Sequence, residues 1–133
     1  MKNFGLMARF DTGFDESMIS NIKNHIQENG HRLEEANIGN DRNSRLDKSI
    51  RNCSAFSIDR TYWLTQMLNC YVHEVNQSVF KYDLTTWHDE LQYILYEGKG
   101  SKYAWHYDNG AKENETGIRK LSLVFLSLPI FAS

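Results

Sequence analysis

The strongest constraint on the fold is an amphipathic segment near the middle of the 133-residue chain. Its apolar residues recur at i, i+3, i+4, i+7, i+8 and i+11, at Leu64, Met67, Leu68, Tyr71, Val72 and Val75. This spacing puts them on one face of an α-helix, so it predicts a helix whose apolar face packs on another layer, most simply a sheet. Asp59 is predicted to cap the start of this helix.

A helix is also predicted upstream, with Asp15 as its N-cap and Gly30 at its end. Its apolar positions are Met18, Ile19, Ile22 and Ile26. A polar surface loop is expected over residues 39–48. The β-prone segments come later, at residues 50–58, 91–96, 102–108 and 118–128, with a polar turn over 109–117. This order predicts a single α+β domain over residues 1–133, with helices on one face of a mainly antiparallel sheet.

Composition narrows the class of protein. The chain is 41% hydrophobic and 24% charged, and its net charge of −2 comes from acidic and basic residues mixed along the chain. This gives no electrostatic reason to expect binding to nucleic acid or to an anionic membrane. No apolar run approaches a membrane span, and residues 1–10 lack the apolar stretch of a signal peptide, so a cytoplasmic protein is expected.

The cysteine count also limits the options. Cys53 and Cys70 are too few for a disulfide framework or a four-thiolate zinc site. Both are expected to be reduced and packed, with a reactive thiol as the alternative.

His106-Tyr107-Asp108 has a metal-ligating pattern. In a strand, residues i and i+2 point to the same face, so the His106 imidazole and the Asp108 carboxylate can converge on one ion. On a helix the two would lie roughly 200° apart. Imidazole and carboxylate are two ligands of the 2-His-1-carboxylate triad that holds Fe(II). The tripeptide alone is common, and the alternative is a surface strand end with a His–Asp hydrogen bond.

The flanking sequence is more specific than the tripeptide. Tyr96 precedes a Gly-x-Gly turn, then Tyr103, then His106-x-Asp108, which reads as a strand, a turn and a second strand; we call residues 96–108 the ligand hairpin. This order resembles the prolyl 4-hydroxylase-like branch of the Fe(II)/2-oxoglutarate-dependent dioxygenases. The resemblance covers about residues 50–126 and includes an early Arg-x-x-Ser strand, a Phe-x-x-Asp-Leu segment and a strand after the hairpin, at 51–54, 80–84 and 119–123.

The resemblance implies a fold and an activity. The fold would be N-terminal helices packed on an incomplete double-stranded β-helix, that is, a jelly-roll or cupin-like sheet. The activity would be hydroxylation of a peptidyl or small-molecule C–H bond, coupled to conversion of 2-oxoglutarate and O2 to succinate and CO2. The implied cofactors are Fe(II) and 2-oxoglutarate, with ascorbate as an optional reductant.

The resemblance also assigns roles to individual residues. His106 and Asp108 would bind iron, and the Tyr96 hydroxyl would contact 2-oxoglutarate. Tyr103 and Trp105 would line the mouth of the pocket, with Tyr103 on the cosubstrate side and Trp105 on the substrate side. Arg119 would reach the substrate. Each of the last four has a simpler alternative: an inward-facing strand tyrosine for Tyr96, aromatic sheet packing for Tyr103 and Trp105, and a solvated charge for Arg119.

The sequence departs from the family pattern after Asp108. The family has a second histidine and a basic residue for the distal carboxylate of 2-oxoglutarate on later strands, whereas no histidine follows His106 here. His88 is the nearest substitute ligand, although a loop histidine is the simpler interpretation. A truncated domain is therefore expected, and independent turnover is not expected.

Three functional hypotheses stay open at this stage. The first is an oxygenase completed by another chain. The second is an inactive remnant with a weak two-ligand metal site. The third is an interaction module that pairs, through an exposed sheet edge, with a second copy or with a complementing C-terminal fragment.

Overall fold

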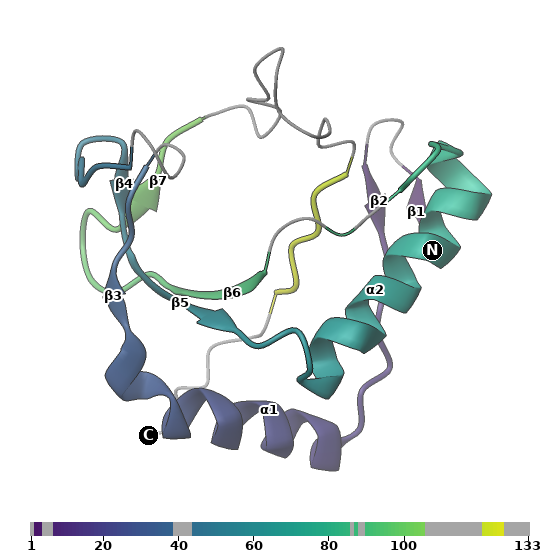
Figure 1. Ribbon diagram of the computed structural model, residues 1–133, viewed down its shortest axis with the longest axis horizontal. Helices are drawn as coiled ribbons and strands as arrows, with labels where there is room; N and C mark the ends of the chain where they lie inside the picture. Colours follow the sequence, from purple (N-terminus) through teal and green to yellow (C-terminus); the bar gives the residue numbers. More distant parts are fainter. Residues whose placement is uncertain are drawn as a thin grey trace.

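The computed structural model describes residues 2–3, 7–38, 44–85, 87, 90–105 and 121–126 (Figure 1). The elements in chain order are β1 (Lys2–Asn3), β2 (Ala8–Arg9), α1 (Glu16–Glu28), the 3-10 turn η1 (Gly30–Arg32), β3 (Glu34–Glu35), β4 (Arg51–Asn52), β5 (Ser54–Ile58), α2 (Trp63–Val75), the π-helical turn η2 (Asn76–Phe80), β6 (Leu91–Leu95) and β7 (Lys102–Tyr103). The described strands form small antiparallel sheets in the orders β1-β2, β3-β5-β6 and β4-β7. With the two helices they make a mixed α+β fold, as predicted.

Helix α1 begins and ends close to where the sequence places it. The Asp15 side chain accepts a hydrogen bond from the Met18 backbone N–H at 2.8 Å, which satisfies one of the free donors of the first turn. Asn29 closes the helix, and Gly30 opens η1. Ile22 is the buried residue of this helix.

Helix α2 confirms the amphipathic pattern but not its predicted cap. Tyr62, without a side-chain cap hydrogen bond, occupies the N-cap position. The Asp59 carboxylate instead accepts from the backbone N–H of Thr61 at 2.8 Å and from its hydroxyl at 2.7 Å. Asp59 therefore forms a tight local turn before the helix, because its short side chain reaches the backbone two residues ahead.

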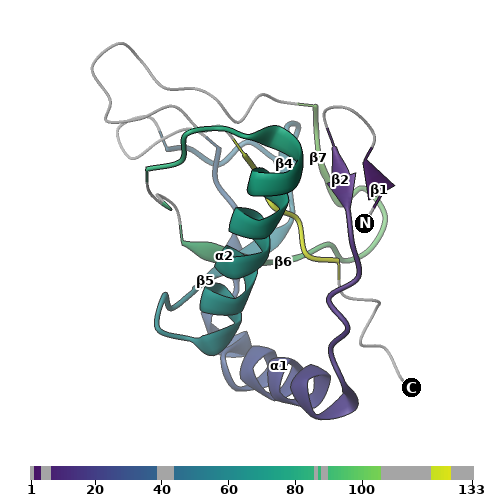
Figure 2. The ribbon, with the colours of Figure 1, turned by 90° about the vertical axis from the view of Figure 1, so that its right-hand side faces the viewer.

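The core lies where the two helices meet the sheet and the C-terminal described segment. Leu64 and Leu68 of α2 form a buried cluster with Ile22 of α1, and partly buried side chains packed on it include Leu91 of β6, Leu123 and Phe125. Residues 121–126 run between β6 and α2 in Figure 1 and pass behind α2 in Figure 2. Their burial alternates residue by residue, yet they are not assigned to a strand, so the predicted strand over 118–128 is not formed in its described part.

The residues that precede α1, among them Phe10 and Thr12, contact α2. The Tyr71 hydroxyl donates to the Thr12 carbonyl at 2.8 Å, and the Tyr71 ring lies 5.1 Å from that of Phe10. Figure 2 shows the β1–β2 pair beside this helix. Cys70 is exposed on α2, so the expectation that it is packed is wrong, whereas Cys53 is buried and free as expected.

The predicted strand over residues 50–58 forms as β4 and β5, interrupted at Cys53. Both β6 and β7 run antiparallel to it, with Ser54 opposite Leu95 and Asn52 opposite Lys102. Neighbouring strand residues direct their backbone groups to opposite edges. The Cys53 carbonyl accepts from Ala36 next to β3, and the Ile50 carbonyl accepts from Ala104, so β7 lies on the same edge as β6.

The glycine turn of the ligand hairpin therefore does not reverse the chain. Leu95 pairs with Ser54 and Lys102 pairs with Asn52, so seven positions along this chain segment lie opposite only two positions along the neighbouring strand. Residues 96–101 therefore bulge out, and β7 continues in the same direction as β6. Gly98 and Gly100, with φ of 73° and 88°, adopt the left-handed conformation that this excursion needs. The predicted strand over 91–96 is confirmed as β6, and the one over 102–108 is formed only at Lys102–Tyr103, with its residues 106–108 outside the described part of the chain. The hairpin between them was wrong.

Candidate functional site

Of the two tyrosines predicted from the sequence, Tyr103 contacts Arg51 and Tyr96 lies near its charge, where β4 pairs with β7. Arg51 lies directly opposite Tyr103, and its guanidinium carbon is 4.6 Å from the centre of the Tyr103 ring. This cation–π contact holds the guanidinium against the sheet and is worth about 0.5–2 kcal/mol, depending on how well it is desolvated. Tyr103 is thus packed in the sheet, as its simpler interpretation predicted. The charged group above its ring is the Arg51 guanidinium.

Tyr96 follows β6 and belongs to the same group of side chains. Partial burial raises the pKa of its hydroxyl above the ordinary value, Cys53 and Tyr103 raise it further, and the nearby Arg51 charge lowers it. The phenol therefore keeps its proton at neutral pH and can donate a hydrogen bond. About half of Tyr96, 48%, is exposed, so a ligand can reach it.

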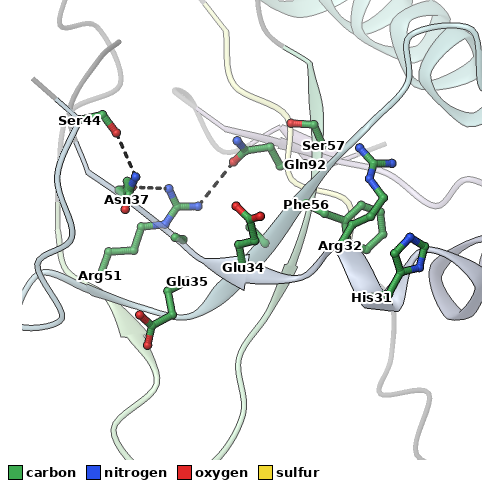
Figure 3. Close-up of a pocket in the computed structure, with 12 residues that line it drawn as sticks. His31, Arg32, Glu34, Glu35, Asn37, Ser44, Arg51, Phe56, Ser57 and Gln92 are labelled. Atoms are coloured by element: carbon green, nitrogen blue, oxygen red, sulfur yellow. Dashed lines mark hydrogen bonds between the residues drawn. The ribbon is translucent and has the colours of Figure 1, made fainter. Parts of the chain in front are cut away.

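Arg51 also borders a polar hollow of about 620 Å³ over β3, β5 and β6 (Figure 3). Its lining includes the charged or polar side chains of His31, Arg32, Glu34, Asn37, Arg51 and Gln92. Tyr96 and Tyr103 are not in this lining. Arg51 is the residue that joins the hollow to the two tyrosines.

Not every donor of the Arg51 guanidinium has an acceptor among the described residues. Nη1 donates to the Asn37 carbonyl at 3.0 Å, and Nη2 contacts the Gln92 carbonyl oxygen at 3.5 Å. Nε is buried, and among the described residues it has no acceptor. A buried donor without a partner costs about 1–3 kcal/mol, so this atom marks a place where the unliganded chain leaves a favourable contact unmade.

The other predicted site residues fall into two groups. Trp105, just beyond β7, is fully exposed at 104%, so it does not pack on the sheet, and its predicted role at the mouth of a pocket stays a prediction. The predicted iron ligands His106 and Asp108, the predicted substrate residue Arg119 and the alternative ligand His88 lie outside the described residues. The convergence of His106 and Asp108 is therefore still an expectation.

The histidines of the described part do not offer another metal site. His25 stacks on Tyr62 with ring centres 3.8 Å apart, His31 contacts the Glu28 carbonyl through Nδ1 at 3.1 Å, and His73 is exposed on α2. Across residues 7–38, 44–85, 87, 90–105 and 121–126, we find no group of three or more His, Cys, Asp or Glu side chains that could hold a metal.

Sequence reasoning missed Arg51 and Gln92 as site residues. Arg51 enters the sequence analysis only through the Arg-x-x-Ser pattern at 51–54, and Gln92 only as a member of the β-prone segment 91–96. An arginine inside a β-prone segment was the available signal, because a charge there needs either solvent or a partner. Its importance depends on the pairing of β4 with β7, which joins residues far apart in the sequence.

Comparison with known proteins adds no assignment: no family model, curated protein or solved structure matches the chain. In the described part of the chain, no helix is long and apolar enough to cross a membrane.

Proposed function

We propose that this chain supplies iron-binding and cosubstrate-binding residues of an Fe(II)- and 2-oxoglutarate-dependent dioxygenase of the prolyl 4-hydroxylase type. The observation that supports the proposal is the contact of Tyr103, on the strand that leads toward His106, with Arg51, together with the half-exposed Tyr96 hydroxyl near the same charge. The finer fold that accompanies it is part of a double-stranded β-helix. The helices behind the β3-β5-β6 sheet are compatible with that architecture.

His106 and Asp108 would hold the iron, since imidazole and carboxylate suit Fe(II) and a strand directs alternate side chains to one face. The iron would supply the redox chemistry that couples 2-oxoglutarate decarboxylation to hydroxylation of a peptidyl or small-molecule C–H bond. The protonated Tyr96 hydroxyl would donate to a carboxylate of 2-oxoglutarate. Trp105, exposed one residue before His106, and Arg119 would contact the substrate.

Binding is the sharper test than turnover, because the triad needs a third protein ligand and no histidine follows His106 in this sequence. Anaerobic titration of the chain with Fe(II) and then 2-oxoglutarate should produce the visible charge-transfer absorption of the iron–2-oxoglutarate chelate. His106→Ala and Asp108→Ala should abolish it. His73→Ala removes an exposed histidine of α2 and should leave it intact. Absorption that survives in His106→Ala would refute the assignment of the ligand.

The role of Tyr96 is tested separately with Tyr96→Phe, which removes the hydroxyl and keeps the ring. A hydrogen bond to a charged group contributes about 1.5–3 kcal/mol, so 2-oxoglutarate should bind about 10–100-fold more weakly. Fe(II) binding without 2-oxoglutarate should not change. An unchanged 2-oxoglutarate affinity would leave Tyr96 as a structural residue only.

A second candidate function, self-association as an interaction module, is favoured by the outward face of residues 121–126. Val124 and Leu126 are 76% and 83% exposed on a β-prone segment whose burial alternates residue by residue. Such a segment can add as a strand to another chain. Sedimentation over a wide concentration range should show dimers that Val124→Lys abolishes, while Met7→Lys, at another exposed apolar position, should not. A wild-type chain that stays monomeric would exclude this function.

A further inference from the structure

Arg51 has a donor edge that the protein itself does not fill. The guanidinium presents Nε and Nη2 side by side, and a carboxylate can accept from both in parallel. In Arg51, Nε has no acceptor among the described residues, and the Nη2 contact with Gln92 at 3.5 Å is at the limit of a hydrogen bond. The opposite nitrogen, Nη1, is already engaged by the Asn37 carbonyl.

We infer that the Nε–Nη2 edge of Arg51 binds a single carboxylate group of a small molecule that enters the polar hollow. The inference goes beyond the proposed function, since it needs neither iron nor His106. Tyr103 fixes the guanidinium plane from one side, and Asn37 fixes one of its nitrogens. The cation is therefore held in place before the ligand arrives, which reduces the entropy lost on binding.

Gln92 is the group that the carboxylate displaces. Its side chain is exposed, and Figure 3 shows its amide carbonyl oxygen directed at the Arg51 guanidinium across the hollow. A neutral amide oxygen at long distance is a weaker acceptor than a carboxylate, because charge-assisted hydrogen bonds are shorter and stronger. The carboxylate therefore replaces Gln92 on Nη2 and adds the acceptor that Nε lacks, and the exposed Gln92 amide returns to solvent.

The charges around the hollow select a singly charged ligand. His31, Arg32 and Arg51 line it together with Glu34 and Glu35, and Glu35 is already paired with Lys48. The Glu34 carboxylate points into the hollow in Figure 3. It repels a dianion about twice as strongly as a monoanion, which offsets the stronger attraction of Arg51 for the dianion, so a monocarboxylate fits better than a phosphate or another dianion.

The test uses the full-length chain in EDTA, with acetate and inorganic phosphate as probes. The Arg51 Nε–H signal in ¹⁵N NMR spectra should shift and saturate with acetate, because the carboxylate accepts from that donor. Arg51→Lys keeps the charge but lacks the two-donor edge, so acetate affinity, followed by backbone amide shifts around the hollow, should fall about tenfold. Arg32→Gln, on the same hollow but stacked over Phe56, should change it less than twofold.

Each outcome decides the inference. An Arg51 Nε–H signal that does not move with acetate would overturn it, and so would equal losses in Arg51→Lys and Arg32→Gln, since that result indicates only a diffuse positive potential. Phosphate should bind more weakly than acetate in the wild-type chain and gain affinity in Glu34→Gln. Tighter phosphate binding in the wild type would contradict the single-carboxylate assignment. Because iron is absent, these results are independent of the test of the proposed function.

Discussion

Asn76 is the residue on which the segment after α2 most depends. It is 7% exposed, and its side-chain amide donates to the Tyr82 carbonyl at 2.8 Å and accepts from the Tyr82 N–H at 3.0 Å. Asn76→Ala removes two hydrogen bonds worth about 1 kcal/mol each and leaves both Tyr82 groups unsatisfied, so we expect a loss of about 2–4 kcal/mol in the free energy of unfolding. Urea denaturation followed by circular dichroism measures this loss.

The matched control is Gln77→Ala, which removes an exposed side chain from the same π-helical turn and should cost less than about 0.5 kcal/mol. Asn76→Asp adds a pH test. Burial and the facing Tyr82 carbonyl should raise the pKa of the new carboxyl above its unfolded value of about 3.9, against the opposing effect of the Tyr82 N–H, which donates to the ionised form. The stabilising hydrogen bond from the protonated acid is then present below that value and lost as pH rises through the folded pKa. Equal costs for Asn76→Ala and Gln77→Ala would refute the reasoning.

Two further predictions concern the core and the turn before α2. Leu68 is fully buried at 0% exposure, so Leu68→Ala should lower the free energy of unfolding by about 3–5 kcal/mol. Cys70→Ala, on the exposed face of the same helix, should change it by less than about 0.5 kcal/mol. Thermal and urea unfolding measure both changes. Hydrogen bonds from the backbone and hydroxyl of Thr61 lower the pKa of Asp59 below 3.8. NMR titration should therefore show that the Asp59 carboxyl ionises at a lower pH than it does in Thr61→Val. The stability that this turn adds should disappear as pH falls through that lowered pKa.

The parts of the fold that local sequence determines were the parts that could be predicted. Helix α1 has its cap and its apolar face within its own residues, and α2 has a long amphipathic repeat. The π-helical turn η2 was missed, because it depends on a contact between Asn76 and Tyr82 that no periodic pattern records. The prediction that Asp59 caps α2 was wrong for a related reason. A carboxylate can accept from any backbone N–H within reach, and Asp59 accepts from Thr61, before the helix begins.

The candidate site also divides into residues that the local sequence identifies and residues that only the fold identifies. Tyr96 and Tyr103 were found because a short motif contains them, whereas Arg51 became a site residue only through the strand register that sets it opposite Tyr103. Gln92 reaches Arg51 from β6 for the same reason. Register is decided by the whole sheet, since a shift of one residue would turn every side chain to the other face.

The path of residues 96–101 allows a decisive test of this register. Seven steps along one strand match two along the other, so five residues are in excess between Leu95 and Lys102. Deleting residues 97–101 removes that excess, including both left-handed glycines, and joins Tyr96 directly to Lys102. Lys102 then falls opposite Asn52 without any shift in pairing, so the sheet should survive the deletion.

A reversing hairpin would respond in the opposite way, because strands that run in opposite directions cannot be joined without turn residues. The measurement is cross-strand NMR contacts between Arg51 and Tyr103, together with slow hydrogen exchange at the Ala104 amide, which donates to Ile50. Retention of both in the deletion variant would show that β6 and β7 form one interrupted strand. Their loss, with β5 and β6 still paired, would show that the turn itself holds β7 in place and would refute the continuous-strand description.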